Sequence, residues 1–407
     1  MFQLTKNNSF FLFGARGVGK STLIRTSFDF ERAILIDLLS VDTRNRLLDD
    51  PDSLMRMIPR DVEWVFIDEV QKVPDLLDVV HKLIEDRGIK FGLTGSSARK
   101  LKHGGANLLA GRAFVYHLFP FTAFELGSQF QLDEALMWGT LPKIFTLESP
   151  EDKQRFLKAY ANTYIQEEVW EEHLIKDLVP YRRFLQVAAQ CIGTTLNFSR
   201  IAEDTRVDPK TVQRYFQILE ETLLGFFLQP FHRSLRKRQR ANPKFYFFDI
   251  GVQRALTSDF AMEYGRGSLG YGNRFKHFMI CEIMRLNEYR QTGYDISFIR
   301  EDDDIEIDLV LSHSNGTLFF IEIKSTDYVT EDHVRSLKYF SAKFPEAQLM
   351  LWSVERRSKN FGSIVSKHWT EGLEALFCVF RRSRTGIPEQ AGQRASPHRS
   401  VATSGFI

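Results

Sequence analysis

The chain has 407 residues, of which 43% are hydrophobic, and a formal net charge of +2. This length predicts two to four domains rather than one, and the hydrophobic content is enough for several packed cores. The nearly balanced charge excludes a uniformly basic or acidic protein, so an argument for a nucleic-acid partner must rest on local clusters of charge.

The sequence also lacks the patterns of membrane and disulfide-rich proteins. No apolar run approaches the roughly 18 residues that a membrane-spanning helix needs, and the N-terminus lacks a basic region followed by an apolar one. Three scattered cysteines, Cys191, Cys281 and Cys378, have neither an even number nor a zinc-ligand spacing. We therefore expect a cytoplasmic protein with no membrane partner.

Residues 1–120 alternate short apolar runs with amphipathic segments. This alternation predicts a parallel sheet covered by helices, that is, an α/β domain. The expected strands are Ser9–Phe13, Ala33–Asp37, Trp64–Asp68, Phe91–Thr94 and Phe114–Leu118.

The first expected strand leads into GARGVGKS at residues 14–21, which fits the phosphate-binding loop G-x-x-x-x-G-K-[ST]. An amphipathic segment from about Lys20 to Phe28 follows, so the loop has the strand and the helix that it requires. Glycines let backbone N–H groups turn toward an anion, and the positive end of the helix dipole adds to the field. We expect Lys20 to contact the β- and γ-phosphates of ATP and Ser21 to hold Mg²⁺. The expected nucleotide-binding residues are Gly14, Ala15, Arg16, Gly17, Val18, Gly19, Lys20, Ser21 and Thr22.

A second ATPase element is the segment EWVFIDEV, in which a buried strand ends in Asp68 and Glu69. A carboxylate at the carboxyl end of a parallel strand, beside the phosphate loop, is placed to hold Mg²⁺, and we give Asp68 this role. Glu69 is placed to orient and deprotonate the attacking water, which is the work of a general base. The pair predicts ATP hydrolysis rather than binding alone.

Two further residues are candidates for contact with the γ-phosphate. The strand FGLTGSS ends in small polar residues, of which we choose Ser96 as the sensor between the first two motifs. Arg112 precedes the last expected strand and is a candidate arginine finger, in its own subunit or a neighbouring one. A surface arginine is the alternative for Arg112, and Arg99 competes for the same role.

The segments GARGVGKST, FIDEVQKVP, LTGSSARKL, LAGRA, FPFTAFEL, WGTLPKIF and NPKFYFFDIGVQRAL occur in the order of a large prokaryotic family of AAA-type ATPases. The chain resembles this family over roughly residues 8–355. Members carry an additional C-terminal domain of unknown function. The resemblance implies an AAA-like P-loop domain, a winged-helix module and a C-terminal domain similar to PD-(D/E)xK nucleases, which are restriction-endonuclease-like in fold.

Changes in the spacing of apolar residues, from strand-like to helix-like and back, divide the chain further. We expect an AAA-like domain over residues 1–120, a helical lid or linker over 121–178, and a winged-helix module with a basic loop over 179–244. Strands with one helix on either side follow over 245–380, the nuclease-like domain. Residues 381–407 are rich in Ser, Gly, Arg and Pro without periodicity, which predicts disorder.

The middle module contains a candidate recognition helix. Asp208–Pro209 predicts a helix start, and Val212, Tyr215, Phe216 and Leu219 form its apolar stripe. The opposite face carries the candidate DNA-contacting residues Lys210, Gln213 and Arg214. The alternative is a module that docks proteins or acts as a hinge.

A dense basic cluster follows this helix directly. It contains Arg233, Arg236, Lys237, Arg238, Arg240 and Lys244, in a chain that is otherwise balanced in charge. Such clusters contact phosphate backbones, although solvated loops have the same composition. Arg236, Lys237 and Arg238 complete our DNA-binding prediction.

The segment DIEIDLVLSHSNGTLFFIEIKS predicts two antiparallel strands. By alternation, Ile305, Ile307, Leu309 and Leu311 share one face of the first strand. A two-residue Asn315–Gly316 turn would set Asp308 against Ile323, whereas an odd loop, Ser314–Asn315–Gly316, sets it against Glu322. We predict the odd loop, because it gathers Asp308, Glu322 and Lys324.

Two carboxylates and a lysine match the D…ExK pattern of the nuclease superfamily. Asp308 and Glu322 would hold Mg²⁺, and Lys324 would polarise the attacking water or stabilise the transition state. Glu282, in the apolar stripe of the preceding helix, is a further candidate ligand, since a buried acid needs a partner. The family often has an acid after the phenylalanine of that helix, but Lys276 stands there. A nuclease-like fold kept for binding therefore remains the alternative to cleavage.

The sequence thus predicts Mg²⁺-dependent ATP hydrolysis coupled to DNA-directed action of the C-terminal half. The contrasting hypothesis is a nucleotide-dependent switch whose distal domains bind protein partners without cleaving nucleic acid. Homo-oligomerisation is open, because Arg112 acts either within its own subunit or on a neighbour.

Overall fold

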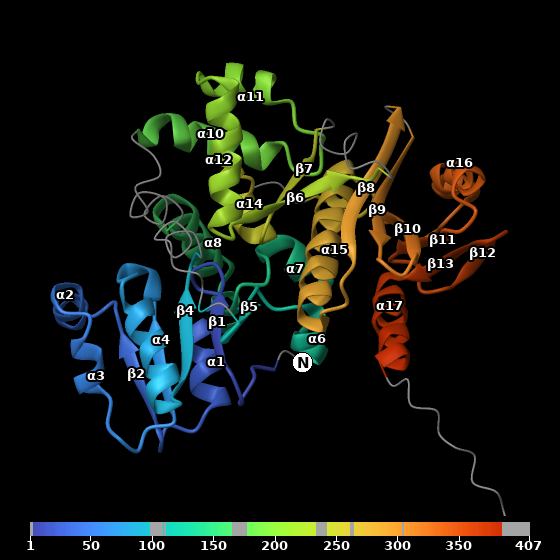
Figure 1. The fold of residues 1–407 in the computed structure, drawn as a ribbon. Helices are drawn as coiled ribbons and strands as arrows, with labels where there is room; N and C mark the ends of the chain where they lie inside the picture. Colours follow the sequence, from blue (N-terminus) through green and yellow to red (C-terminus); the bar gives the residue numbers. More distant parts are fainter. Residues whose placement is uncertain are drawn as a thin grey trace, which may run out of the picture.

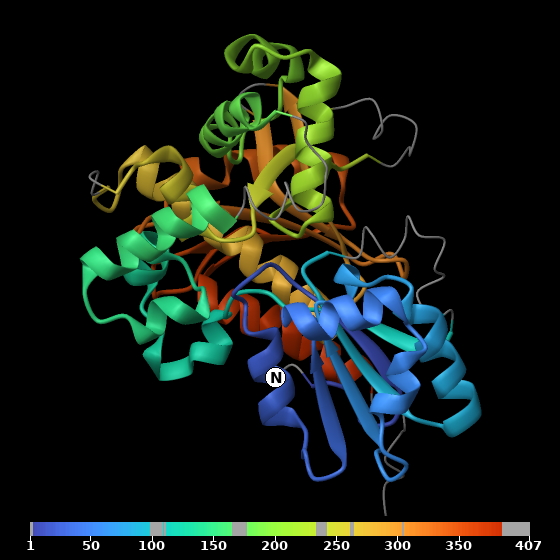
Figure 2. The same ribbon diagram turned by 90° about the vertical axis from the view of Figure 1, so that its left-hand side faces the viewer.

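The computed structural model describes residues 3–97, 109, 111–164, 177–232, 242–260, 264–302 and 305–384, of which residues 163, 164, 302 and 378–384 are described by their backbone only. The chain forms an α/β fold with two sheets (Figures 1 and 2). A parallel five-stranded sheet occupies the N-terminal part, and a mixed eight-stranded sheet occupies the C-terminal part. A group of helices, α10 to α12, lies above them in the view of Figure 1.

The first sheet has the strand order β2-β3-β4-β1-β5, and all its strands are parallel. Its strands are β1 (Ser9–Phe13), β2 (Ala33–Asp37), β3 (Trp64–Asp68), β4 (Lys90–Gly95) and β5 (Ala113–His117). Its helices are α1 (Lys20–Ser27), α2 (Val41–Asp49), α3 (Ser53–Met57) and α4 (Leu76–Arg87), with a 3-10 turn η1 (Val70–Lys72). The five predicted strands and their parallel arrangement are confirmed.

Both faces of this sheet are covered, which explains why its strands are continuously apolar. Phe10 packs in one core cluster with Ile24 of α1, and Phe11 packs in another with Val80 of α4. The first cluster continues beyond the sheet to α10 and α12, for example through Phe184 and Phe216. The AAA-like sheet and the helical module therefore share one core.

Short helices connect the two parts of the chain. They are α6 (Ala123–Leu126), η2 (Gly127–Gln129), α7 (Leu132–Trp138), η3 (Pro142–Thr146), α8 (Pro150–Ala159) and a π-helical turn η4 (Tyr160–Tyr164). The helical module follows with α10 (Leu178–Gln190), α11 (Phe198–Thr205) and α12 (Pro209–Glu221). As predicted, α12 begins at Asp208–Pro209: the Asp208 carboxylate accepts a hydrogen bond from the Thr211 N–H at 3.0 Å.

The second sheet has the strand order β12-β13-β11-β10-β9-β8-β6-β7. Its strands are β6 (Gly225–Pro230), β7 (Lys244–Phe247), β8 (Asp295–Asp302), β9 (Ile305–Ser312), β10 (Leu318–Lys324), β11 (Gln348–Ser353), β12 (Lys359–Phe361) and β13 (Ile364–His368). Its helices are α14 (Ile250–Thr257), α15 (Leu269–Arg290), α16 (Arg335–Lys343) and α17 (Trp369–Arg384), with a turn η5 (Glu331–Val334).

This part differs from the prediction in two respects. One helix was expected on either side of the strands, but α14 and α15 both precede β8, and α16 connects β10 to β11 because these neighbours are parallel and need a crossover. The strand β6 lies within the expected winged-helix module, but it pairs with β7 and also with β8. It therefore belongs to the eight-stranded sheet, which crosses the expected boundary at residue 244.

Two motifs that are far apart in the sequence meet in the core. Asp249, from FFDIG, accepts hydrogen bonds from the N–H groups of Thr140 (2.8 Å) and Val252 (3.1 Å). A Cβ on Gly139 would lie 2.1 Å from the Asp249 carboxylate, and a Cβ on Gly251 would lie 2.1 Å from the Trp138 carbonyl oxygen. The glycines of WGT and FDIG are therefore required by this close approach.

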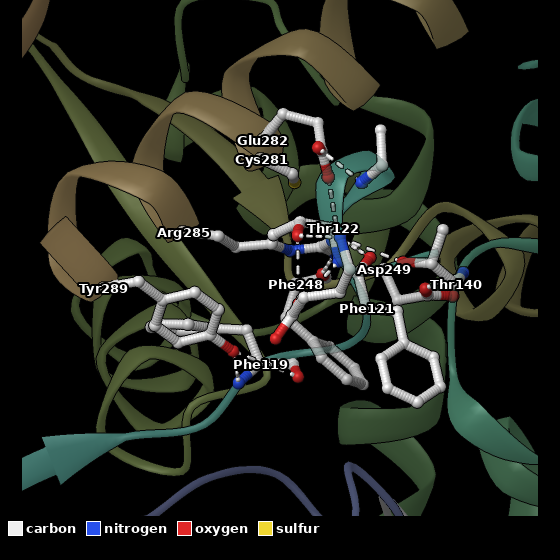
Figure 3. A network of polar contacts seen from close by, with 12 residues as sticks. Phe119, Phe121, Thr122, Thr140, Phe248, Asp249, Cys281, Glu282, Arg285 and Tyr289 are labelled. Atoms are coloured by element: carbon white, nitrogen blue, oxygen red, sulfur yellow. Dashed lines mark hydrogen bonds and ion pairs between the residues drawn. The ribbon is translucent and has the colours of Figure 1, made fainter. Parts of the chain in front are cut away.

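A buried arginine on α15 extends this junction (Figure 3). Arg285, whose exposed fraction is 2%, donates hydrogen bonds to the carbonyl oxygens of Phe121 (3.1 Å) and Phe248 (2.7 Å) and to the Thr140 hydroxyl (3.0 Å). It also pairs with Glu282 at 3.3 Å. The fully buried Glu282 in turn accepts from the Ala123 N–H at 2.8 Å. One side chain thus joins the segment after β5, the WGT turn, the end of β7 and α15.

We expect Arg285→Ala to lower the free energy of unfolding by about 3–5 kcal/mol, because it leaves Glu282 and three other acceptors buried without their donor. Denaturant unfolding followed by circular dichroism measures this. Arg290→Ala, at the partly exposed end of the same helix, should cost less than about 1 kcal/mol. Equal losses in the two variants would show that the network contributes nothing specific.

Candidate functional site

The phosphate loop begins at the carboxyl end of β1 and ends at the start of α1, as predicted. Gly19 caps α1 in the left-handed conformation, with φ 99°, which favours glycine. The Lys20 side chain is buried, and its ammonium donates to the carbonyl oxygens of Gly14 (2.8 Å) and Ala15 (3.3 Å). The loop is thus folded around the lysine that we expect to contact phosphates.

The two predicted Mg²⁺ ligands are neighbours at the edge of the sheet. The Ser21 hydroxyl donates to one oxygen of Asp68 at 2.7 Å, and the Thr94 hydroxyl donates to the other oxygen. A serine hydroxyl and a carboxylate are oxygen donors of the kind that Mg²⁺ takes in nucleotide sites, so the residues present fit the ion.

Glu69 lies next to this pair in a strained backbone conformation. Its φ is 59°, and its N–H donates to the Thr94 hydroxyl at 3.1 Å. Positive φ is costly for a residue with a side chain and persists where the surrounding contacts enforce it. The Glu69 carboxylate lies 4.0 Å from the Lys20 ammonium.

Gln71 connects Glu69 to the predicted sensor Ser96. The Gln71 amide donates to the Glu69 carboxylate and, at 3.0 Å, to the Ser96 hydroxyl. Ser96 is buried and holds Gln71, whereas Thr94 is the residue of this strand that touches Asp68. Contact of Ser96 with a γ-phosphate stays a prediction. Our sequence analysis did not identify Gln71, although its position two residues after Glu69 is a signal that could have found it.

Arg112 does not reach the phosphate loop of its own chain. It precedes β5, whose first residue Ala113 lies beside Ser9 at the start of β1, while the loop follows the end of β1. The two ends are about 15 Å apart over a strand of this length. Arg112 instead pairs with Glu85 of α4. The prediction of a finger within the same subunit is therefore wrong; action on a neighbour stays a prediction. Arg99 lies outside the described residues.

A tyrosine that our sequence analysis missed holds the outer side of the phosphate loop. The Tyr160 hydroxyl, from η4, donates to the Arg16 carbonyl oxygen at 2.7 Å. The Tyr160 ring also lies against Phe248, with their centroids 6.1 Å apart. Phe248 is the residue whose carbonyl accepts from Arg285, so the loop is in contact with the buried junction.

The register of β9 and β10 is the predicted one. Leu309 pairs with Ile321, and Ser312 pairs with Leu318. The same register, extended by one residue beyond Leu309, sets Asp308 opposite Glu322. The His313 N–H donates a hydrogen bond of 3.0 Å to the Thr317 carbonyl oxygen. This bond closes the hairpin, whose loop is the predicted three-residue segment Ser314–Asn315–Gly316. The odd-loop prediction is confirmed.

The predicted faces of β9 are only partly correct. Ser297 pairs with Val310 and Ile299 with Ile307, so Asp308 and Leu309 together oppose the single residue Phe298. This β-bulge breaks the alternation: Ile307 packs in the cluster of α16, whereas Leu309 and Leu311 pack in the cluster of α15. The bulge changes the direction of the Asp308 side chain, an effect that β-bulges often have beside functional sites.

Asp308, Glu322 and Lys324 come together with Lys276 of α15. Lys276 pairs with Asp308 at 2.6 Å, and Lys324 pairs with Glu322 at 2.6 Å. Burial opposes ionisation of Asp308, but the Lys276 and Lys324 ammonium groups outweigh it and lower the pKa of Asp308. Burial and the neighbouring Asp308 raise the pKa of Glu322.

Glu282 does not join this cluster. It lies six residues after Lys276 on α15, which places the two side chains about 120° apart around the helix and about 9 Å along it. The Glu282 carboxylate is held by Arg285 and by the Ala123 N–H. Burial raises the pKa of Glu282 to about 7, although Arg285 opposes the shift. Its predicted role as a metal ligand is therefore wrong; its partner is an arginine.

The predicted DNA-contacting residues of α12 are exposed. Lys210, Gln213 and Arg214 face solvent, while Val212, Phe216 and Leu219 are buried. Arg236, Lys237 and Arg238 lie outside the described residues. Within the described ranges, no helix is long and apolar enough to cross a membrane, and no group of three or more His, Cys, Asp or Glu residues could hold a metal ion.

Comparisons with known proteins agree with the nucleotide site. Residues 6–127 match the AAA domain, residues 129–263 match a domain of unknown function (DUF8612), and residues 271–366 match a second domain of unknown function (DUF4143). The N-terminal part is thus an AAA domain, which implies a P-loop ATPase that binds a nucleotide, typically Mg-ATP. The resemblance to AAA-type ATPases is confirmed for this part of the chain.

The curated relatives are themselves uncharacterized. A protein of Mycobacterium tuberculosis is 27% identical over 319 residues, which are 77% of this chain and 70% of that protein. A protein of Methanocaldococcus jannaschii is 22% identical over 344 residues, 77% of this chain and 74% of that protein.

Two solved structures are similar at a low level. The match to domain III of the replication initiation protein DnaA from Thermotoga maritima covers 42% of this chain and 80% of that chain. It has 18% sequence identity and a TM-score of 0.26. The match to Can2 from Sulfobacillus thermosulfidooxidans, solved in complex with cyclic tetra-adenylate, covers 91% of this chain and 98% of that chain. It has 10% sequence identity and a TM-score of 0.19. TM-scores this low do not establish a shared fold, so we infer nothing about this chain from either structure.

We expect Gln71→Ala to lower the kcat of ATP hydrolysis about 10- to 100-fold, because it removes a hydrogen bond of about 1.5–3 kcal/mol that orients Glu69. Single-turnover kinetics measure the rate, and the affinity for a fluorescent ATP analogue serves as the control. That affinity should stay within about twofold, since Gln71 does not line the phosphate loop. An unchanged kcat would exclude a positioning role for Gln71.

Proposed function

We propose that the protein hydrolyses ATP with Mg²⁺ and couples this reaction to binding of DNA by its C-terminal half. The observation that carries the proposal is the meeting of Lys20, Ser21, Asp68 and Glu69 at one edge of the parallel sheet. The four groups come from two segments, the end of the phosphate loop and the end of β3, and together they would supply the phosphate contact, the metal ligands and the general base of a P-loop ATPase.

In this mechanism each side chain has one task. Lys20 leaves the carbonyl oxygens of Gly14 and Ala15 and binds phosphate oxygens, while the backbone N–H groups of the loop bind the rest. Ser21 and Asp68 would hold Mg²⁺, which supplies positive charge to the phosphates. Glu69, oriented by Gln71, accepts the proton of the attacking water.

The DNA-binding part of the proposal rests on α11, α12 and the paired strands β6 and β7, which we interpret as a winged-helix module. Lys210 and Arg214 are placed to contact phosphates, and Gln213 is placed to reach a base edge. We interpret the eight-stranded sheet, which includes β6 and β7 and carries the D…ExK residues, as nuclease-like.

A direct contact supports coupling between the two functions. The Ser97 hydroxyl, just after β4, donates to the Glu221 carbonyl oxygen at the end of α12 at 3.1 Å. The same strand carries Thr94, which touches Asp68. A change at the γ-phosphate that moves the end of β4 therefore acts on the recognition helix.

We expect Glu69→Gln to lower kcat at least about 100-fold while the protein still binds ATP, because it removes the general base but keeps the shape of the side chain. Lys20→Ala should weaken ATP binding as well. Phosphate release and calorimetric ATP titration measure these effects. Absence of Mg²⁺-dependent turnover in the wild type, with or without duplex DNA, would end the proposal.

We expect the double variant Lys210→Ala, Arg214→Ala to weaken duplex binding and to lower the salt dependence of log Kd by about one unit for each lost phosphate contact. Fluorescence anisotropy at several salt concentrations measures both. The matched control is Arg46→Ala, Lys82→Ala, which removes two exposed charges from α2 and α4. Equal loss in both would indicate a general charge effect. No duplex binding by the wild type would favour the alternative, a nucleotide-dependent switch that binds proteins.

A further inference from the structure

The D…ExK cluster is the strongest feature that ATP hydrolysis does not use. A nuclease of this arrangement needs carboxylate oxygens that are open to a divalent cation. Both oxygens of Asp308 already have donors: the Lys276 ammonium at 2.6 Å and the Ile323 N–H at 2.9 Å. One oxygen of Glu322 pairs with Lys324, and the other is buried without a partner. Unlike the Asp68 carboxylate, which accepts only from neutral hydroxyls, each of these carboxylates is paired with an ammonium group, a positive charge that a metal ion would have to displace.

The balance of charge leads to the same conclusion. Beyond the two ion pairs above, the buried Lys244 pairs with Glu306, two residues before Asp308. The cluster then contains as many ammonium groups as carboxylates, listed here as Lys244, Lys276 and Lys324 with Glu306, Asp308 and Glu322. A divalent cation would add two charges to a neutral, largely buried group, which is unfavourable.

The position of Lys276 is fixed by its helix. Its neighbours Phe275 and His277 are buried, and the His277 ring hydrogen-bonds the Phe247 carbonyl oxygen at 2.7 Å. Arg285 anchors the same helix two and a half turns later. The Lys276 side chain itself is 33% exposed, and its ammonium pairs with the Asp308 carboxylate.

We propose that the Lys276 ammonium takes the place of the divalent cation in this cluster, so that the C-terminal domain has no metal-dependent nuclease activity. The inference rests on the nuclease-like arrangement in the proposed function, but it does not depend on ATP hydrolysis.

Mn²⁺ binding to the full-length, nucleotide-free protein tests this inference, with free Mn²⁺ measured by electron paramagnetic resonance. The wild type and Asp308→Asn should bind Mn²⁺ identically, because Asp308 does not hold a metal ion. Lys276→Glu should gain one Mn²⁺ per chain, since it replaces the ammonium by a carboxylate beside Asp308. Lys276→Met should gain a weaker Mn²⁺ site than Lys276→Glu, because it removes the ammonium from Asp308 but adds no further ligand.

A wild-type Mn²⁺ site that Asp308→Asn abolishes would overturn the inference, and this comparison decides even if Lys276→Glu does not fold. A folded Lys276→Glu variant that gains no Mn²⁺ would also overturn it. Plasmid DNA incubated with the wild type and Mg²⁺ or Mn²⁺ should stay intact, and cleavage that Asp308→Asn abolishes would contradict the account. Because no nucleotide is present, these results are independent of whether the protein hydrolyses ATP.

Discussion

The arrangement of the two halves depends on one buried cation. Arg285 of α15 donates to carbonyl oxygens of Phe121 and Phe248, which belong to segments more than a hundred residues apart in the chain. A buried guanidinium is costly unless its hydrogen bonds are satisfied, so these segments must stay together while α15 is folded. The glycines of WGT and FDIG permit the close approach that this requires. This constraint ties the exit of β5, beside the phosphate loop, to the helix that carries Lys276.

Two contacts connect the nucleotide site to the rest of the molecule. Tyr160 reaches from the phosphate loop to Phe248, next to the Arg285 network, and Ser97 reaches from the end of β4 to the end of α12. The AAA-like sheet and the helical module also share one hydrophobic core. Because packed cores transmit small displacements rather than absorb them, a change at the γ-phosphate has a physical path to the proposed DNA-binding surface.

Much of this arrangement was predictable from local patterns. Continuous apolar runs predicted the five parallel strands, and the GARGVGKS and IDE segments predicted the groups that meet around Lys20 and Asp68. The choice of a three-residue loop over a two-residue turn predicted that Asp308 lies opposite Glu322. The β-bulge at Asp308–Leu309 was not predictable, because it leaves no local mark in the sequence. The partner of Glu282 was predictable, since Arg285 lies three residues later on the same helix. The position of Arg112 also followed from the predicted parallel arrangement, because a residue that precedes a strand lies at the opposite end of the sheet from the phosphate loop, which follows a strand.

The central claim is that nucleotide and DNA binding are coupled, and coupling is reciprocal in free energy. The most direct test is the Kd for duplex DNA of the Glu69→Gln variant, which should bind ATP without turning it over, measured with and without saturating Mg-ATP. The account predicts a change of at least about fivefold, in the range of ordinary coupling free energies. Equal values of Kd in a variant shown to bind both ligands would contradict it.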